Sequence, residues 1–448
     1  MSIAVQSSPA RTITVVHNPP ASSNILRQLD TWVAFLPLLF FTARGTFSFE
    51  NTASNTPMAG TFGTLMASTV DAARHNGEMV AFYAIICLLC VRFYKSIAAA
   101  FVENKLITLL PILAIASTAW SQVPTRSLSF GIMALLNTAF AFYLVKRYNH
   151  TQQLQLLLAV GVIALLLSFL LVAFYPAAGI DQKENIENAW EGMFGHKNHC
   201  AMIMTYLLTP VFYLKLTTQR QRFLRGLYIV ATIFLIAMTT SRTGWILLAL
   251  SVFFALAIRF LRRMNAKERL FSTISIVALA ALVAYLVISQ AAAIAVILGK
   301  DPTLTGRTQI WNALLQPIFK NPLLGYGYYA FWIGFQGEAA TTALAIGARN
   351  LGNAENGILQ MWLELGAVGI FFLLLALYQL CRMAIAVFKR DSSNYVQWCL
   401  CIVFLTLATG LVAGDKFMFP HTIEWTLLVM VYASLHERLK ELRATEVP

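Results

Sequence analysis

Long apolar runs separated by short polar segments dominate this chain of 448 residues. A helix needs about 20 residues to cross the roughly 30 Å hydrocarbon core of a bilayer, because it rises about 1.5 Å per residue. Runs approaching that length predict membrane-spanning helices at residues 30–43, 79–94, 105–120, 128–145, 153–175, 199–216, 226–241, 244–258, 271–291, 357–380, 396–413 and 423–435. The first and last runs are short and the ninth is long, so we expect about 12 spans, within a range of roughly ten to thirteen.

The composition agrees with a polytopic membrane protein. Hydrophobic residues make up 58% of the chain, charged residues only 12%, and the mean hydropathy is +0.66. Soluble globular proteins do not have such a composition. We therefore expect an all-α polytopic fold. The start of the chain lacks a basic segment followed directly by an apolar core and a small-residue cleavage site, so we expect no removable signal peptide.

The positions of lysine and arginine predict the orientation, because cytoplasmic loops carry an excess of both. Most of the 33 basic residues fall on one side if both termini are cytoplasmic. This predicts a cytoplasmic N-terminal tail at 1–29, a membrane domain at 30–437 with periplasmic loops at 44–78, 176–198 and 300–356, and a cytoplasmic C-terminal tail at 438–448. The net charge of +13 then mostly reflects topology. Membrane lipids, and not nucleic acid, are the expected partner of the cytoplasmic surface.

The longest predicted loop, 300–356 between the ninth and tenth spans, is too aromatic for a disordered segment. Its rings suit sugar binding, or equally an aromatic belt at the headgroup level. Within it, Arg307 follows Gly306, which breaks the chain so that a helix lying on the membrane can start. Arg242 occupies a tight turn between two spans, where Asn or Gly would serve better.

Two outward arginines fit a diphosphate, because the guanidinium group offers a rigid fork of donors to phosphate oxygens. Lys197 would add a point charge. For Arg307 the alternative is a snorkelling arginine that binds lipid headgroups. His196 and His199 are three residues apart, but no third ligand accompanies them, so we predict no metal and no cofactor. The six cysteines lie in or beside spans, which favours packing over disulfides.

A polar stripe begins the tenth span. Asn356, Gln360 and Glu364 recur every four residues and so share one helical face, which would be costly against lipid. We expect this face to line a polar cavity inside the bundle, although Glu364 equally fits a structural pairing with another helix. Glu355, at the mouth of that cavity, is freer to do chemistry. His421 in the last outer loop is either a proton acceptor or an interfacial residue.

These motifs together resemble the O-antigen ligase and polysaccharide polymerase superfamily, particularly exopolysaccharide polymerases of the Wzy type. The resemblance covers roughly residues 190 to 370 and rests on Gly-His-Lys-Asn (195–198), Ser-Arg-Thr (241–243), Gly-Arg-Thr-Gln-Ile-Trp (306–311), Asn-Pro-Leu-Leu-Gly-Tyr-Gly-Tyr (321–328) and the segment Glu-Asn-Gly-Ile-Leu-Gln (355–360) with its continuation to residue 369. It implies a GT-C-like membrane glycosyltransferase that acts on polyprenyl-diphosphate-linked glycans at the periplasmic face of a bacterial inner membrane. It also implies a chain-length regulator and a flippase of the same pathway as partners.

The resemblance assigns Arg242 and Arg307 to the donor diphosphate. Members of the superfamily commonly carry a His-Asn pair before the tenth span, with the histidine proposed as the base. This chain has Glu355 followed by Asn356, so Glu355 is the expected base, with His421 in reserve. The expected substrate-binding residues are His196, Lys197, Asn198, Asn356, Gln360, Glu364 and His421.

The expected activity is metal-independent, inverting polymerisation of lipid-linked repeat units. A ligase of the same superfamily, which transfers finished glycan to lipid A core or to protein, is scarcely separable from a polymerase by these motifs. A secondary transporter is the third alternative. Transporters often show two similar halves, whereas the long loop of this chain lies in its second half only.

Overall fold

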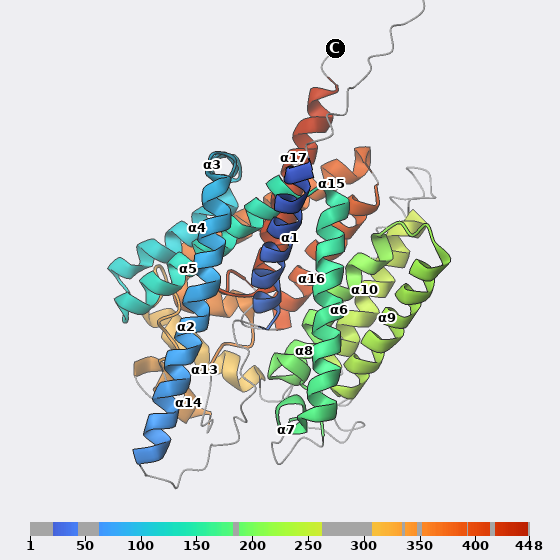
Figure 1. Ribbon diagram of the computed structural model, residues 1–448. Helices are drawn as coiled ribbons and strands as arrows, with labels where there is room; N and C mark the ends of the chain where they lie inside the picture. Colours follow the sequence, from blue (N-terminus) through green and yellow to red (C-terminus); the bar gives the residue numbers. More distant parts are fainter. Residues whose placement is uncertain are drawn as a thin grey trace, which may run out of the picture.

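The computed structural model describes residues 21–43, 62–181, 188–261, 307–333, 337–346, 352–391, 393–412 and 417–446 (Figure 1). Within these ranges the regular structure is helical, apart from one isolated bridge between Ile180 and Trp190. The expected all-α fold is confirmed. The first ten helices in the described ranges are α1 (Ala21–Thr42), α2 (Phe62–Arg92), α3 (Tyr94–Glu103), α4 (Lys105–Ala116), α5 (Pro124–Arg147), α6 (His150–Phe174), α7 (Pro176–Gly179), α8 (Lys197–Tyr213), α9 (Gln219–Met238) and α10 (Arg242–Leu261).

The second part of the chain supplies α13 (Arg307–Lys320), α14 (Gly337–Ala345), α15 (Gly357–Arg390), α16 (Asn394–Val412) and α17 (Ile423–Ala444). Eleven of the twelve predicted spans coincide with a helix. The remaining one, the ninth span at 271–291, lies outside the described residues. Six described helices are long and apolar enough to cross a membrane, or seven if α2 and α3, which meet at 92°, form one span. The chain is therefore a polytopic membrane protein, and the number twelve stays a prediction.

Several helices begin inside segments that the sequence predicts to be loops. α2 starts at Phe62, well within the predicted loop 44–78, and α3 occupies a stretch between two predicted spans. α3 buries Ile97 and Ala100 on one face, whereas its apolar residues Tyr94 and Val102 are exposed. The predicted loop 300–356 contains α13 and α14; α13 is described from Arg307, and Gly306 lies outside the described residues.

α17 is the central helix of the bundle and packs against α1, α5, α15 and α16. Its residues from Ile423 to Leu435 are almost all buried, which explains why its apolar run is short: protein, and not lipid, surrounds it. Buried polar groups in an apolar interior are usually hydrogen-bonded, and Trp425 is one example. The indole N–H of Trp425 donates to Thr138 Oγ1 at 3.0 Å. These contacts fix α17 against α5.

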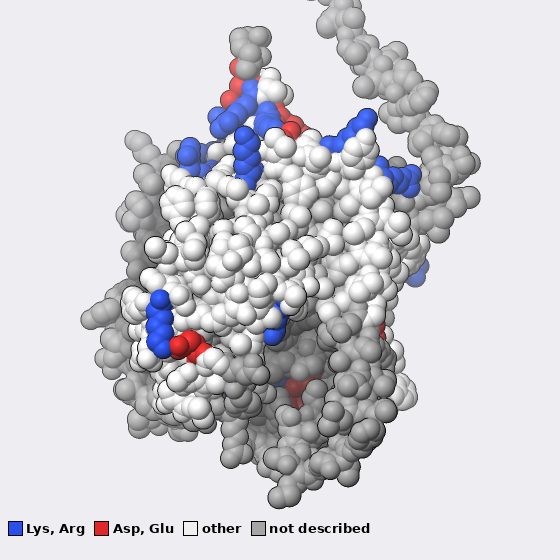
Figure 2. Space-filling view, turned by 90° about the vertical axis from the view of Figure 1, so that its left-hand side faces the viewer, with Lys and Arg blue, Asp and Glu red and all other residues white. Residues whose placement is uncertain are grey.

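Charged side chains mark one end of the bundle. Figure 2 shows lysines and arginines gathered around the end of the molecule where α17 terminates, above a broad band with few charged residues. Ion pairs tie α3, α5 and α17 together at this end, with Lys146 Nζ 2.5 Å from Glu437 Oε1 and Lys440 Nζ 3.0 Å from Glu103 Oε1. This is the end that the basic residues predict to be cytoplasmic. The helices α8, α10, α13 and α15 begin at the opposite end (Figure 1).

Candidate active site

Arg307 and Glu355, two of the three expected catalytic residues, form an ion pair. Arg307 is the first residue of α13, and its Nη2 lies 3.0 Å from Oε2 of Glu355. The side chains are 20% and 35% exposed, so both are accessible to a ligand. Glu355 has a left-handed backbone with φ 49°, and its N–H donates to Asn353 Oδ1 at 2.7 Å, which holds this turn. The start of α13, 48 positions earlier in the chain, thus places Arg307 beside the expected base.

The polar side chains behind this pair form a connected network. Gln360 Oε1 accepts hydrogen bonds from the indole N–H of Trp332 at 3.0 Å and from the backbone N–H of Ala354 at 2.9 Å. Gln360 Nε2 donates to Glu364 Oε1 at 2.6 Å. Gln360 and Glu364 are each only 4% exposed. The predicted face therefore does point inward, and there it supports the loop that carries Glu355. Whether these two side chains touch substrate stays a prediction.

Asn356 has a different position from the one that the stripe predicts. It precedes α15 as its N-cap, where its Oδ1 accepts from the backbone N–H groups of Ile358 and Leu359. An asparagine in this position satisfies donors that have no partner within the helix. Its Nδ2 donates to the carbonyl of Leu411 at 3.2 Å. Asn356 therefore starts α15 and ties it to the end of α16.

The tenth predicted span is not one straight helix. Gly366 interrupts α15 with φ 65° and ψ −164°, so the backbone hydrogen bonds of a continuous helix cannot form across it. The segment 322–327 fills the gap. The N–H groups of Tyr326 and Gly327 donate to the carbonyls of Leu363 and Glu364, and the N–H of Ala367 donates to the carbonyl of Pro322. The Asn-Pro-Leu-Leu-Gly-Tyr-Gly-Tyr motif thus completes α15.

The second tyrosine of that motif anchors the segment to the last outer loop. Burial raises the pKa of Tyr328 well above its usual range, so its hydroxyl stays protonated and donates to the carbonyl of Met418. Its backbone N–H donates to Ser117 Oγ at 2.9 Å. The segment is therefore held on both sides, and it presses against α15 just behind the loop that bears Glu355.

A second cluster joins the Gly-His-Lys-Asn and Ser-Arg-Thr motifs. Ser241 Oγ donates to Asn198 Oδ1 at 2.8 Å, across the starts of α10 and α8. His196 caps α8, where its Nδ1 accepts from the backbone N–H of Asn198. Lys197 is the first residue of α8, and Arg242, the first residue of α10, is exposed. The Ser241–Asn198 hydrogen bond thus joins the helix start that carries His196, Lys197 and Asn198 to the one that carries Arg242, and the roles of these residues stay predictions.

The last part of α16 contacts the N-cap residue of α15 and the middle of α8. On one side Asn356 binds the carbonyl of Leu411, and on the other Tyr206 of α8 hydrogen-bonds Thr409 of α16 at 2.9 Å. Four helices therefore begin at this end of the bundle: α8, α10, α13 and α15. A helix N-terminus carries a partial positive charge and unpaired N–H groups, which favour an anion. The cations of each cluster, Arg307 in the first and Lys197 and Arg242 in the second, therefore lie beside helix starts that favour an anionic group.

Comparison with known proteins covers the same residues. A family described as O-Antigen ligase matches residues 227–374, which include Arg242, Arg307 and Glu355. The chain is also 25% identical over 310 residues to the Exopolysaccharide production protein ExoQ of Rhizobium meliloti (strain 1021), across 67% of this chain and 69% of ExoQ. Both similarities support the resemblance to the O-antigen ligase and polysaccharide polymerase superfamily. The function is accordingly of the O-antigen ligase or polymerase type.

Four of the expected residues lie outside the stretch that matches the O-antigen ligase family. His196, Lys197 and Asn198 precede it and His421 follows it. His421 is 7% exposed and has a left-handed backbone with φ 46°. Its ring lies 6.1 Å from that of Phe130, and its backbone N–H donates to the Tyr83 hydroxyl at 3.2 Å. The role of His421 as a reserve base stays a prediction.

Arg126 is a further cation at this end of the bundle, and it does not belong to any of the motifs. It lies in the first turn of α5, and its Nη1 donates to the carbonyl of Trp332 at 3.2 Å. Its guanidinium is 5.1 Å from the centre of the Tyr329 ring, which stacks on Phe130 at 3.9 Å. A search for arginines in the predicted outward segments, which drew attention to Arg242 and Arg307, would also have found Arg126.

Proposed function

We propose that this protein polymerises polyprenyl-diphosphate-linked repeat units of an exopolysaccharide or O-antigen-type glycan at the periplasmic face of a bacterial inner membrane. A sugar hydroxyl of one lipid-linked glycan attacks the anomeric carbon of another. The new glycosidic bond forms as the bond to the diphosphate breaks, and polyprenyl diphosphate leaves with the electron pair. Glu355 takes the proton of the attacking hydroxyl. Attack opposite to the leaving group inverts the anomeric centre.

The Arg307–Glu355 ion pair carries this proposal. In the structure each group neutralises the other at 3.0 Å. A diphosphate bears more negative charge than one carboxylate and matches the guanidinium fork, so it competes for Arg307 when the donor binds. Glu355 then loses its partner beside the reacting centre and becomes available as a base. Donor binding would thus create the base, which limits proton abstraction to the loaded site.

The remaining cations stabilise the leaving group. Charge develops on the diphosphate oxygens as the sugar departs, and fixed donors aimed at that charge lower the barrier. Arg242 is exposed at the start of α10, and Lys197 lies at the start of α8. The hydrogen bond from Ser241 to Asn198 joins these two helix starts. We assign the diphosphate to these two groups together with Arg307.

The second candidate is a ligase, favoured by the description of the matching family as O-Antigen ligase. The chemistry at the donor is the same in both cases, since polyprenyl diphosphate leaves from the anomeric carbon. Only the acceptor differs: a second lipid-linked glycan for a polymerase, and lipid A core or a protein for a ligase. The test must therefore follow the acceptor as well as the donor.

Mass spectrometry of polyprenyl-diphosphate-linked glycans, extracted from cells that lack the protein, separates these activities. Accumulated single repeat units are the result expected for a polymerase. Long chains stranded on the carrier would instead establish the ligase. Unchanged carrier-linked glycans would refute both.

Complementation of those cells with point variants tests the residues. Arg307→Lys keeps the charge but loses the fork, and Glu355→Gln removes the base. We expect each to lower the rate of chain growth by roughly 100-fold, the usual loss for one transition-state donor. Lys320→Gln is the matched control, because Lys320 also lies on α13 and also forms an ion pair, 2.7 Å from Glu338. Wild-type chain growth by Arg307→Lys would refute the diphosphate assignment.

A further inference from the structure

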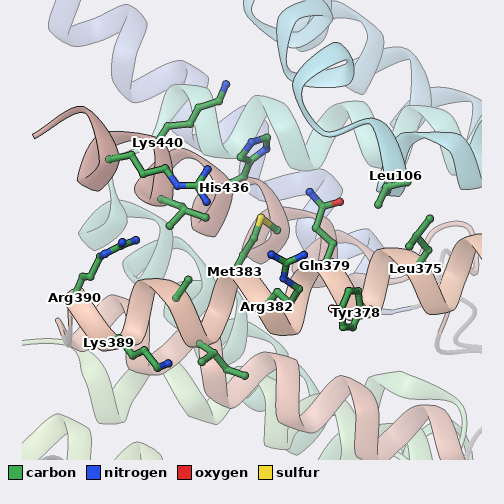
Figure 3. Close-up of a pocket in the computed structure, with 14 residues that line it drawn as sticks. Leu106, Leu375, Tyr378, Gln379, Arg382, Met383, Lys389, Arg390, His436 and Lys440 are labelled. Atoms are coloured by element: carbon green, nitrogen blue, oxygen red, sulfur yellow. The ribbon is translucent and has the colours of Figure 1, made fainter. Parts of the chain in front are cut away.

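A basic cavity lies at the end of the bundle opposite to Arg307 and Glu355. It has a volume of about 770 Å³ and is enclosed by α4, α15 and α17 (Figure 3). Figure 3 shows Arg382 and Gln379 projecting from α15 toward the helix that carries His436 and Lys440. Arg382 lies 25 residues after the first residue of α15 and beyond the break at Gly366, so the cavity is well separated from the candidate active site. The proposed glycosyl transfer does not use it.

The charge of the cavity is strongly positive and only partly compensated. Its lining includes no acidic residue and five basic ones: Arg382, Lys389, Arg390, Lys440 and Arg443. Lys440 pairs with Glu103 at 3.0 Å, and Arg390 pairs with Glu446 at 3.0 Å. Among the residues that the structure describes, none offers a carboxylate within 4.0 Å of Arg382, Lys389 or Arg443. Three cations therefore remain to balance an anion from outside the chain.

The rest of the lining is mostly apolar, with Gln379 and His436 as its polar members, and Ile385 is 56% exposed. Leu106 of α4 and Leu375 of α15 line the cavity on the side away from the charges (Figure 3). Tyr378 lies between the two regions, is 60% exposed, and has the guanidinium of Arg382 5.7 Å from its ring centre. An aromatic ring beside a cation is typical of the boundary between lipid chains and headgroups. The ligand that fits has an anionic head and an apolar tail.

We propose that this cavity is a binding site for an anionic phospholipid of the surrounding membrane. Arg382, Lys389 and Arg443 contact the phosphate groups of the head, and the acyl chains run along Leu106 and Leu375. Basic pockets between transmembrane helices on the cytoplasmic side bind headgroups with more than one phosphate. Three uncompensated cations favour such a head, since a single phosphate would leave positive charge unbalanced. A cardiolipin-type lipid with two phosphates therefore binds more tightly than a lipid with one.

Lipid titration of the purified, delipidated full-length protein by native mass spectrometry tests this site. The probes are cardiolipin, phosphatidylglycerol, zwitterionic phosphatidylcholine and a polyprenyl phosphate. We compare the wild type with the triple variant Arg382→Gln, Lys389→Gln and Arg443→Gln. Each basic residue near a membrane surface contributes about 1 kcal/mol to binding an anionic lipid, so the triple variant should bind cardiolipin at least about tenfold more weakly.

The matched control removes the same charge elsewhere. Arg220, Arg222 and Arg225 are exposed in the first turns of α9, and their replacement by glutamine should leave cardiolipin binding unchanged. Equal losses in the two triple variants would overturn the proposal, because surface charge alone would then explain the binding. Tighter binding of phosphatidylcholine or of the polyprenyl phosphate than of cardiolipin would overturn it as well.

Two further variants keep the test decisive if the triple variant is unstable. Arg443→Gln alone alters an exposed residue close to the chain end and should weaken cardiolipin binding about threefold or more. Exchanging the three residues for the other basic type, as Arg382→Lys, Lys389→Arg and Arg443→Lys, should preserve binding. Wild-type binding by Arg443→Gln, or complete loss in the charge-preserving variant, would contradict a site based on charge.

Discussion

Replacement of Gln360 by leucine removes the centre of the network behind the candidate active site. Leucine has a similar volume but neither donates nor accepts a hydrogen bond. In the wild type Gln360 accepts from Trp332 at 3.0 Å and from the backbone of Ala354 at 2.9 Å, and donates to Glu364 at 2.6 Å. With Gln360 only 4% exposed, water does not readily replace these partners.

The cost follows from the groups left without a partner. Each buried donor that loses its acceptor costs about 1–3 kcal/mol. Gln360→Leu leaves the N–H groups of Trp332 and Ala354 without an acceptor, and it removes the side-chain donor that Glu364 accepts from. We therefore expect a loss of about 2–6 kcal/mol in the free energy of unfolding. Ala354 directly precedes Glu355, so the base shifts with it. A misplacement of about 1 Å lowers a catalytic rate roughly 100-fold.

Two measurements check this expectation. Thermal unfolding of the purified variant in detergent reports the stability, and the length of carrier-linked glycans in complemented cells reports the activity. Gln379→Leu is the matched control on the same helix, because Gln379 accepts a single hydrogen bond, from Tyr432 at 2.7 Å, and its loss should cost about 1 kcal/mol. If Gln360→Leu were no less stable than Gln379→Leu, the network would not be what holds this loop.

Two further substitutions test the fold. Gly366→Ala should sharply reduce the yield of monodisperse protein, because φ is 65° and an added Cβ would lie 2.2 Å from the carbonyl oxygen of Leu323. Gly226→Ala, with no atom within 4 Å of the added Cβ, should not, and equal yields would refute the role of the break. Burial raises the pKa of the Asp391 carboxyl, but the backbone N–H two residues later and the guanidinium of Arg438 outweigh it and hold that pKa below its ordinary value. This carboxyl therefore stabilises the fold above the ordinary pKa of about 4, and the contribution is lost as the pH falls further. Asp391→Asn should lower the melting temperature at pH 7 and converge with the wild type toward pH 3, and a constant difference between the two would contradict this pairing.

The pattern of apolar runs located most helices but not their shapes. Eleven predicted spans coincide with helices because membrane length and apolarity are local properties of the chain. The break at Gly366 escaped prediction, since the hydrogen bonds that replace the helical ones come from residues 322–327. Likewise, α17 has a short apolar run because other helices surround it, and a sequence pattern does not distinguish protein from lipid as the neighbour.

The sequence by itself determined the membrane class, the expected orientation and the chemical types at the candidate site. Composition and the lengths of the apolar runs determine the membrane class, and the distribution of lysine and arginine predicts the orientation. The arginine, glutamate and asparagine residues of the predicted outer segments indicate the chemical types at the site. The tertiary structure alone decided which of these residues meet. Arg307 and Glu355 are 48 positions apart and pair at 3.0 Å, because the start of α13 packs against the start of α15. No local pattern encodes that contact, since it depends on how α13, α15 and the segment between them close on one another.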